Sequence, residues 1–328
     1  MTNTKNKKFN IPLIPGYIII YPMVIGVIFN SFVPSFLEMG GFMTAIKNGT
    51  GPLVGAFLFF LGASLDIRST PAAVKRGGIV IITKIALSVA IGLAVAFFFN
   101  DSFLGLSSLA IIGGISVANN ALYSGITGEF GSDAEKGAVG VTILSVGPIV
   151  TMIALSSAGL AAITPGAIIG CVLPLVIGLL VGTANASLKE TLTVAYPGTT
   201  ILVGFALGAN MSIAQLFQGG LSGVLLGLIT ALIVGSVTIV VDKVTGGTGV
   251  AGAAISSTAG SGIANPAALA AVDPTYALIA PIATSQIAAS VIITAFLTPL
   301  LTGWVYKRNL KKAEEKGISA TTKTVIAK

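Results

Sequence analysis

Apolar runs long enough to cross a membrane recur from one end of this 328-residue chain to the other. About 20 apolar residues span the roughly 30 Å of hydrocarbon in a bilayer. Charged residues make up only 9% of the sequence, against about 25% in an ordinary soluble domain. Because so few charges cannot cover a water-exposed surface, we expect a multi-pass membrane protein with no separate soluble domain.

The apolar runs predict ten transmembrane helices, which places both termini on one side of the membrane. The expected spans are 11–30, 51–66, 77–98, 105–126, 137–158, 165–184, 195–211, 219–241, 249–271 and 276–306. Basic residues gather before the first span, after the second and after the last: Lys5, Lys7, Lys8, Arg68, Lys75, Arg76, Lys307, Arg308, Lys311 and Lys312. Only Lys47 falls in a loop on the other side. The positive-inside rule therefore predicts cytoplasmic termini, a retained first span and a solvated basic tail over 307–328.

Two pairs of similar segments share one spacing. Residues 59–67 (FFLGASLDI) resemble 205–213 (FALGANMSI), and residues 117–121 (VANNA) resemble 263–267 (IANPA). The same 146 residues separate both pairs (63 to 209 and 119 to 265). This indicates duplication of a five-span unit, with repeats over 1–158 and 159–306. Since five is odd, the second copy enters from the opposite face, which gives an inverted repeat. Chance similarity between small-residue packing faces is the alternative.

The spans 105–126 and 249–271 carry glycines, polar residues and a proline where an unbroken helix is expected. Asn265 followed by Pro266 is typical of a helix start, with asparagine as the N-cap, and Asn119 occupies the matching place. A half-helix that starts inside the membrane presents free N–H groups and a positive dipole end. Two such starts predict a site for a carboxylate between the repeats. The alternative is that these residues only allow close helix packing.

The candidate substrate-binding residues are the amides, hydroxyls and one cation near these breaks: Asn119, Asn120, Asn265, Ser116, Ser257, Ser261 and Lys84. Lys84 lies eight residues beyond Arg76, roughly 12 Å along a helix. It either extends to the cytoplasmic surface or faces a water-filled cavity and attracts an anion. The candidate coupling-ion residues are Thr142, Ser145, Thr258, Thr284 and Gln286. Their neutral oxygens suit Na⁺ and equally suit helix packing.

The acidic residues fall at span ends or in loops, so no carboxylate is an evident proton carrier. They are Asp66, Asp101, Glu129, Asp133, Glu135, Asp242 and Asp273. Histidine is absent, and neither an HExxH motif nor a Walker loop occurs, so the sequence argues against an intramembrane enzyme and against an ATP-driven pump. No cofactor is expected apart from a coupling ion, H⁺ or Na⁺, and the net charge of +7 serves topology rather than nucleic-acid binding.

Short motifs along nearly the whole chain resemble the 2-keto-3-deoxygluconate permease family. They lie at 83–86 (TKIA), 119–123 (NNALY), 147–148 (GP), 151–153 (TMI), 251–252 (AG), 256–260 (SSTAG), Pro266 and 283–285 (ATS). The resemblance implies uptake of a sugar-acid anion coupled to protons across a bacterial inner membrane. It also implies the fold of the bile-acid/sodium symporters, in which a core domain with crossing broken helices moves against a panel domain.

The resemblance departs at Ser116, around the first break, and at Ser145, just before the Gly-Pro of the fifth span, where the family is expected to carry acidic residues. Coupling to Na⁺, or transport of another small carboxylate, therefore stays open beside the leading expectation. That expectation is a symporter for 2-keto-3-deoxygluconate or a similar anion, working by alternating access. A passive channel or facilitator is the further alternative. The expected partners are the anionic substrate and membrane lipid, and the oligomeric state is open.

Overall fold

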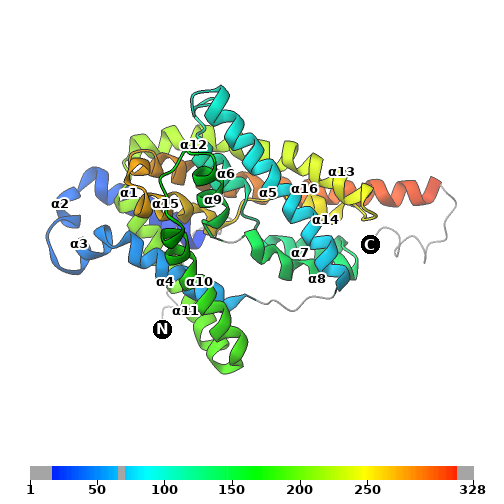
Figure 1. Cartoon of the computed structure of the whole chain (residues 1–328), viewed down its shortest axis with the longest axis horizontal. Helices are drawn as coiled ribbons and strands as arrows, with labels where there is room; N and C mark the ends of the chain where they lie inside the picture. The colour runs from blue at the N-terminus through cyan, green and yellow to red at the C-terminus, as the bar shows by residue number, and fades with distance from the viewer. Residues whose placement is uncertain (1–16, 66–70, 146, 316–328) are drawn as a thin grey trace, which may run out of the picture.

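The computed structural model of the chain describes residues 17–65, 71–145 and 147–315 (Figure 1). Within these ranges every regular element is a helix, and the only β-type pairing is an isolated bridge between Phe103 and Leu106. The expected all-helical class is therefore confirmed. The expectations attached to Lys5, Lys7, Lys8, Asp66, Arg68 and the tail beyond Glu315 lie outside the described residues.

Several helices of the described chain are long and apolar enough to cross a membrane. Five qualify by length and composition: α5 (Pro71–Phe98), α10 (Pro165–Ala184), α11 (Ala186–Ala209), the continuous run Ile213–Val244 and most of α16 (Ala280–Glu315). The run comprises α12 (Ile213–Leu228), the π-helical η2 (Ile229–Val234) and α13 (Gly235–Val244). The pair α6 (Ser108–Ile115) and α7 (Asn120–Phe130), bent by 44°, makes up to six. The chain is thus a multi-pass membrane protein.

Shorter helices occupy the remaining expected spans and their connections. The apolar α1 (Tyr17–Phe32) and α4 (Thr50–Ser64) lie in the first two spans. The 3-10 helix η1 (Ala138–Ser145) and α9 (Ile149–Ser157) lie in the fifth, and α14 (Val250–Ala254), η3 (Gly260–Ala264) and α15 (Asn265–Val272) lie in the ninth. The connections hold α2 (Pro34–Leu37), α3 (Gly41–Asn48), α8 (Asp133–Gly137) and η4 (Pro274–Tyr276).

Helix ends differ from the expected ends where capping carries a helix beyond its apolar run. The helix α11 begins at Ala186 rather than at 195, because the side chain of Asn185 accepts a hydrogen bond from the Leu188 N–H. Polar residues then extend the helix past the apolar stretch. The last helix likewise continues to Glu315, so the basic tail begins as helix.

The helices α1, α4, α10 and α11 pack against one another as one group, named here the panel. Backbones approach closely where glycines face carbonyl groups: a Cβ on Gly208 of α11 would overlap the carbonyl oxygen of Met23 in α1. The same holds between α10 and α4, where a Cβ on Gly178 would overlap the carbonyl oxygen of Phe59. Small residues allow this approach between membrane helices. The panel thus contains two similar pairs, α1 with α11 and α4 with α10.

The other helices form a second group, named here the core: α5 to α9 with η1, and α12 to α16 with η2, η3 and η4. Here α12 lies along α16, α5 packs on α6 and η1, and α13 packs on α14. Figure 1 shows α5, α13, α14 and α16 together on the right, while α1 to α4 lie on the left. The two interrupted spans lie within the core. The core is therefore the part that positions the site.

The glycine contacts in the panel predict a clear stability difference between two positions of one helix. We expect Gly208→Ala to lower stability by about 1–3 kcal/mol, because the added methyl forces α11 away from α1. Gly198→Ala on the same helix, where nothing lies within 4 Å of the new Cβ, is the matched control and should be neutral or slightly stabilising. Thermal unfolding of the detergent-purified proteins measures both. Equal melting temperatures for the two variants would contradict the packing described here.

Candidate functional site

The first interrupted span breaks between α6 and α7. Residues Val117 and Ala118 are not helical, and the Asn119 side chain then accepts a hydrogen bond from the Leu122 N–H at 3.0 Å. Asn119 is therefore the N-cap of α7, as the sequence predicts. The Ser145 hydroxyl, at the end of η1, accepts from the Ala118 N–H at 3.3 Å. The break thus has defined polar partners within the protein, as backbone at membrane depth requires.

The second break lies between α14 and α15 and is built differently from the expected one. Residues Ser257 to Ala259 are not helical, and the 3-10 helix η3 then runs directly into α15. Asn265 is consequently the first residue of α15 and not its cap, and the prediction of an N-cap at Asn265 is wrong. Because the preceding turn is already helical, its side chain is free to bind elsewhere. Its amide nitrogen donates to the Gly113 carbonyl in α6 at 3.0 Å.

Hydrogen bonds join the two breaks directly. The Ala259 N–H donates to the Val117 carbonyl at 3.3 Å, and the Asn119 N–H donates to the Ser257 hydroxyl at 3.2 Å. Each break therefore satisfies backbone groups of the other. The point where the two interrupted spans meet, named here the crossing, is a shared polar structure rather than two separate ones.

Lys84 on α5 lies underneath the crossing. Its amino group donates to the Val117 carbonyl at 3.1 Å and to the Ser257 carbonyl at 2.6 Å, and its exposed fraction is 0%. In this conformation Lys84 therefore does not extend to the cytoplasmic surface, which was one of its two expected arrangements. It does not line the cavity at the crossing either. Lys84 instead contacts both breaks from within the packed core, on α5, and not from the cavity.

An aspartate at the same distance upstream caps the first half of each interrupted span. The Asp101 carboxylate accepts from the Ser108 N–H at the start of α6, and the Asp242 carboxylate accepts from the Gly249 N–H before α14. In both cases the two residues are seven positions apart. Asp242 also forms a buried ion pair with Arg76 at 2.9 Å. The sequence placed both aspartates at span ends but gave no sign of this shared role.

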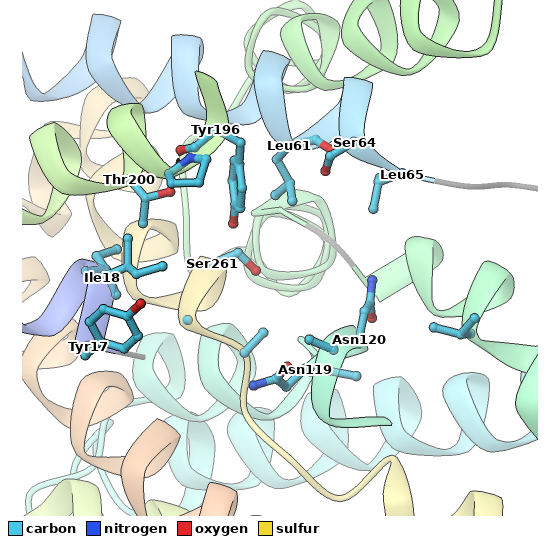
Figure 2. A pocket seen from close by; sticks show the side chains of 17 residues that line it. Tyr17, Ile18, Leu61, Ser64, Leu65, Asn119, Asn120, Tyr196, Thr200 and Ser261 are labelled. Carbon is cyan, nitrogen blue, oxygen red and sulfur yellow. Dashed lines mark hydrogen bonds between the residues drawn. The ribbon is translucent and has the colours of Figure 1, made fainter. Parts of the chain in front are cut away.

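Both breaks face one cavity of about 540 Å³ between the core and the panel (Figure 2). The panel contributes residues of α1, α4 and α11, and the core contributes the two breaks and Val139 of η1. Three of the predicted substrate-binding residues line this cavity: Asn119, Asn120 and Ser261. The volume lies in the range of roughly 300–1,000 Å³ that is usual for small-molecule sites. Among the residues that the structure describes, none that lines the cavity carries a formal charge.

The two asparagines at the first break present hydrogen-bond donors to the cavity. The side-chain oxygen of Asn119 accepts from Leu122, and that of Asn120 accepts from the Thr142 hydroxyl at 2.6 Å. With both oxygens engaged as acceptors, the NH₂ group of each amide is the part available to a ligand. The N-terminus of α7 begins at the same place, and its positive dipole end favours an anion there. The described wall of the cavity thus offers a carboxylate neutral hydrogen-bond donors and a helix N-terminus.

The other predicted site residues are divided between the crossing and more distant places. Ser116 and Ser257 are buried at the breaks without lining the cavity, and the Ser116 hydroxyl has no hydrogen-bond partner within the described chain. Thr258 bonds to the Ser290 hydroxyl at 2.8 Å. Thr142, Ser145 and Thr258 thus lie at the breaks. The remaining two lie elsewhere.

Those two residues, on α16, face other neighbours. The Gln286 amide nitrogen donates to the Gly105 carbonyl at 2.6 Å. Thr284 lines a second cavity of about 410 Å³ together with Thr50 and Asn210. This second cavity lies between the start of α4, the end of α11 and the start of α16. It is therefore at the opposite end of α4 and α11 from the first cavity.

Sequence reasoning missed the panel side of the first cavity. Tyr17 of α1, Ser64 of α4, and Tyr196 and Thr200 of α11 line it. In Figure 2 the hydroxyl groups of Tyr17, Tyr196 and Ser261 point into the same space. The Tyr196 ring packs on Phe57 with a centroid distance of 5.4 Å, which fixes its direction. A tyrosine followed by Pro197 inside an apolar span was the available signal.

Comparison with known proteins agrees with these features. The family model of 2-keto-3-deoxygluconate permeases matches residues 8–311. The chain is 44% identical over 310 residues to 2-keto-3-deoxygluconate permease 1 of Salmonella typhimurium, covering 94% of this chain and 98% of that protein. It is 36% identical to the 2-keto-3-deoxygluconate permease of an Enterobacter species (94% and 96% covered). With that of Escherichia coli the identity is 33% (94% and 97% covered). Permeases are transporters and not enzymes, and the chain belongs to the 2-keto-3-deoxygluconate permease family.

Proposed function

We propose that the protein is a symporter that imports 2-keto-3-deoxygluconate, or a closely similar sugar-acid anion, together with protons. The names of its relatives support the substrate. The observation that carries the proposal is the single cavity onto which both breaks open, with amide donors and a helix N-terminus on one wall and hydroxyl groups on the other. This division matches a molecule that has a carboxylate at one end and hydroxyl groups along its chain.

In the proposed complex the carboxylate lies at the start of α7. The NH₂ groups of Asn119 and Asn120 and the free N–H groups of the first turn donate to it. The hydroxylated part of the substrate extends toward the hydroxyls of Ser261 and Tyr196, which can donate and accept, and toward Thr200, whose hydroxyl already donates to the Tyr196 carbonyl and is left as an acceptor. Binding therefore joins the core to the panel, because the carboxylate contacts the core alone while the hydroxylated part also contacts Tyr196 and Thr200 of the panel.

The proposed architecture is two inverted five-helix repeats, over 1–158 and 159–306. The paired panel contacts support it, since α1 with α11 is the symmetric equivalent of α10 with α4. The capping aspartates support it as well, because Asp101 and Asp242 each accept from an N–H seven residues later, at the start of a half-helix. An inverted repeat supplies two similar arrangements of core and panel, and exchange between them gives access from alternate sides.

The proposed membrane orientation has cytoplasmic termini and this conformation open to the cytoplasm. The start of α1 and the end of α4, both on the side of the basic flanks, line the larger cavity. The smaller cavity lies at the opposite ends of α4 and α11. We propose that movement of the core along the panel closes the first cavity and opens the second. The protein then resides in the bacterial inner membrane.

Transport against a gradient tests the proposed function. In proteoliposomes we expect labelled 2-keto-3-deoxygluconate to accumulate when an inward proton gradient is imposed. An inward Na⁺ gradient at equal pH should give no accumulation. Accumulation of the substrate under a Na⁺ gradient alone would identify Na⁺, and not H⁺, as the coupling ion. Equilibration without accumulation under both gradients would indicate a passive facilitator, and no entry of this substrate would overturn the substrate assignment.

The amide donors give a second prediction. Replacing Asn119 with alanine removes a hydrogen bond to a charged group, worth about 1.5–3 kcal/mol, and also removes the cap of α7. We expect the KM for uptake to rise roughly ten- to a hundredfold. Asn309→Ala is the control, because Asn309 donates to the Thr248 carbonyl, outside the cavity. Unchanged uptake by Asn119→Ala at equal expression would remove this residue from the site.

The panel hydroxyls give a third prediction, which concerns specificity. Tyr196→Phe keeps the ring on Phe57 and removes only the hydroxyl. We expect affinity for the hydroxylated substrate to fall about two- to tenfold, the cost of one neutral hydrogen bond, with less effect on a competing keto acid that lacks the distal hydroxyls. Tyr306→Phe, away from the cavity, is the control. Equal losses for both ligands in competition binding would place the hydroxyl chain of the substrate elsewhere.

A further inference from the structure

Lys84 is buried in a way that leaves its charge without an opposite charge. Its amino group donates to the backbone carbonyls of Val117 and Ser257, which carry partial and not full negative charges. Among the described residues none of the ion pairs includes Lys84. A buried cation that lacks a counter-ion is costly and is retained in membrane proteins mainly for function.

The charged groups on the elements packed against α5 are engaged elsewhere or exposed. Asp242 of α13 pairs with Arg76, and Glu135 of α8 binds Ser132 and the Thr248 hydroxyl. Asp133 pairs with Lys136 within α8, and Lys243 of α13 bonds to Asn309. Lys75 and Glu129 are exposed, and α6, α9, α14 and η1 carry no charged residue. Within the described chain, Lys84 is therefore the charged group at the crossing.

The other described groups that can titrate do not suit a proton carrier at the cavity. The cavity itself contains only the phenols of Tyr17 and Tyr196, and phenols stay protonated at neutral pH. Asp273 lies in a loop, where hydrogen bonds from the Thr275 hydroxyl and the Ala162 N–H hold the pKa of its carboxyl below its usual range. Asp273 consequently stays ionised throughout neutral pH.

We propose that Lys84 carries the coupling proton of this transporter and transmits its protonation state to the substrate site through the carbonyls of Val117 and Ser257. The inference rests on the proposed symport function and names the residue that performs the coupling. Lys84 acts as a positioning residue and not as a ligand, because it lies behind the crossing and does not line the cavity.

The step is a simple proton transfer. In the conformation open to the uptake side, the lone pair of the neutral Lys84 amine accepts a proton from a hydronium ion, which leaves a water molecule and an ammonium. The same proton returns to water on the release side. A substrate with one negative charge and Lys84 with one positive charge then cross the membrane centre together. The loaded core carries no net charge from this pair, and the returning empty core has neither charge.

Protonation affects the substrate site by two routes. The α6 and α14 helices end at the breaks, and a positive charge there offsets the negative ends of their dipoles. The same charge raises the affinity of the cavity for an anion, because Val117 precedes Ala118 of the lining and Ser257 accepts a hydrogen bond from Asn119 of the lining. When the proton leaves, both effects end. The two carbonyls then accept from a neutral amine, and the anion is released.

The test uses two variants with a control on the same helix. Lys84→Gln keeps hydrogen-bond donors and has no charge, Lys84→Arg keeps a charge that does not titrate, and Lys75→Gln is the exposed control. Binding of labelled 2-keto-3-deoxygluconate to purified protein is measured as a function of pH. For wild type and Lys75→Gln we expect affinity to fall by up to about tenfold per pH unit in the alkaline range, the slope for one linked proton. Lys84→Arg should bind the substrate with an affinity that does not change with pH over this range. Lys84→Gln should bind it weakly, and again with an affinity that does not change with pH.

Transport supplies the second readout. In proteoliposomes neither Lys84 variant should accumulate substrate under a proton gradient, while Lys84→Arg should still bind it. A wild-type slope of affinity with pH in either folded variant, or proton-driven accumulation by either, would overturn the proposal. Wild-type accumulation by a Na⁺ gradient alone would instead be a failure of the proposed function. If both variants fail to fold, proton uptake by wild type on substrate binding in weak buffer decides: one proton per substrate supports the proposal and none overturns it.

Discussion

The two carbonyl groups that the amino group of Lys84 binds belong to the non-helical backbone of the two breaks, Val117 in the first and Ser257 in the second. A helix that stops inside the bilayer frees its last carbonyls, and lipid supplies no water to satisfy them. Here Lys84 donates to Val117 of one break and Ser257 of the other, while Ala259 and Asn119 add backbone donors between the breaks. The crossing is stable because the free backbone groups of each break form hydrogen bonds with the other break or with Lys84. The cavity depends on it, since its lining residues adjoin these groups.

The sequence predicted the class of fold and the location of the breaks from physical constraints that act locally. Long apolar runs predict membrane helices, and every expected span contains helix in the structure. Glycines and polar caps locate the breaks, and Asn119 caps α7 as expected. Asn265 shows the limit of this reasoning. Asparagine before proline is typical of an N-cap, but a 3-10 turn precedes it here and its amide binds Gly113 across the crossing.

The parts of the site that could not be predicted are those that depend on packing between distant segments. Tyr196 lines the cavity because α11 packs against α4 and Phe57 fixes its ring. For Lys84 the sequence left two arrangements open, and the structure has neither. Its depth in a helix was evident from spacing, but the carbonyls that it binds are 33 and 173 residues away. Only the fold brings such groups together.

In the proposed mechanism, the placement of charge accounts for an anion at the centre of the membrane with no basic residue among the described residues that line the cavity. An arginine in the wall would bind a carboxylate tightly in either conformation and would oppose its release. Amide and backbone donors at the start of α7 are weaker and neutral, so the electrostatic share of binding comes from outside the cavity. A charge behind the crossing can be removed by loss of one proton without any change in the groups that contact the substrate. In the proposed mechanism recognition and driving force belong to different residues, Asn119 and Asn120 for the first and Lys84 for the second. The two functions meet at the carbonyls of the breaks.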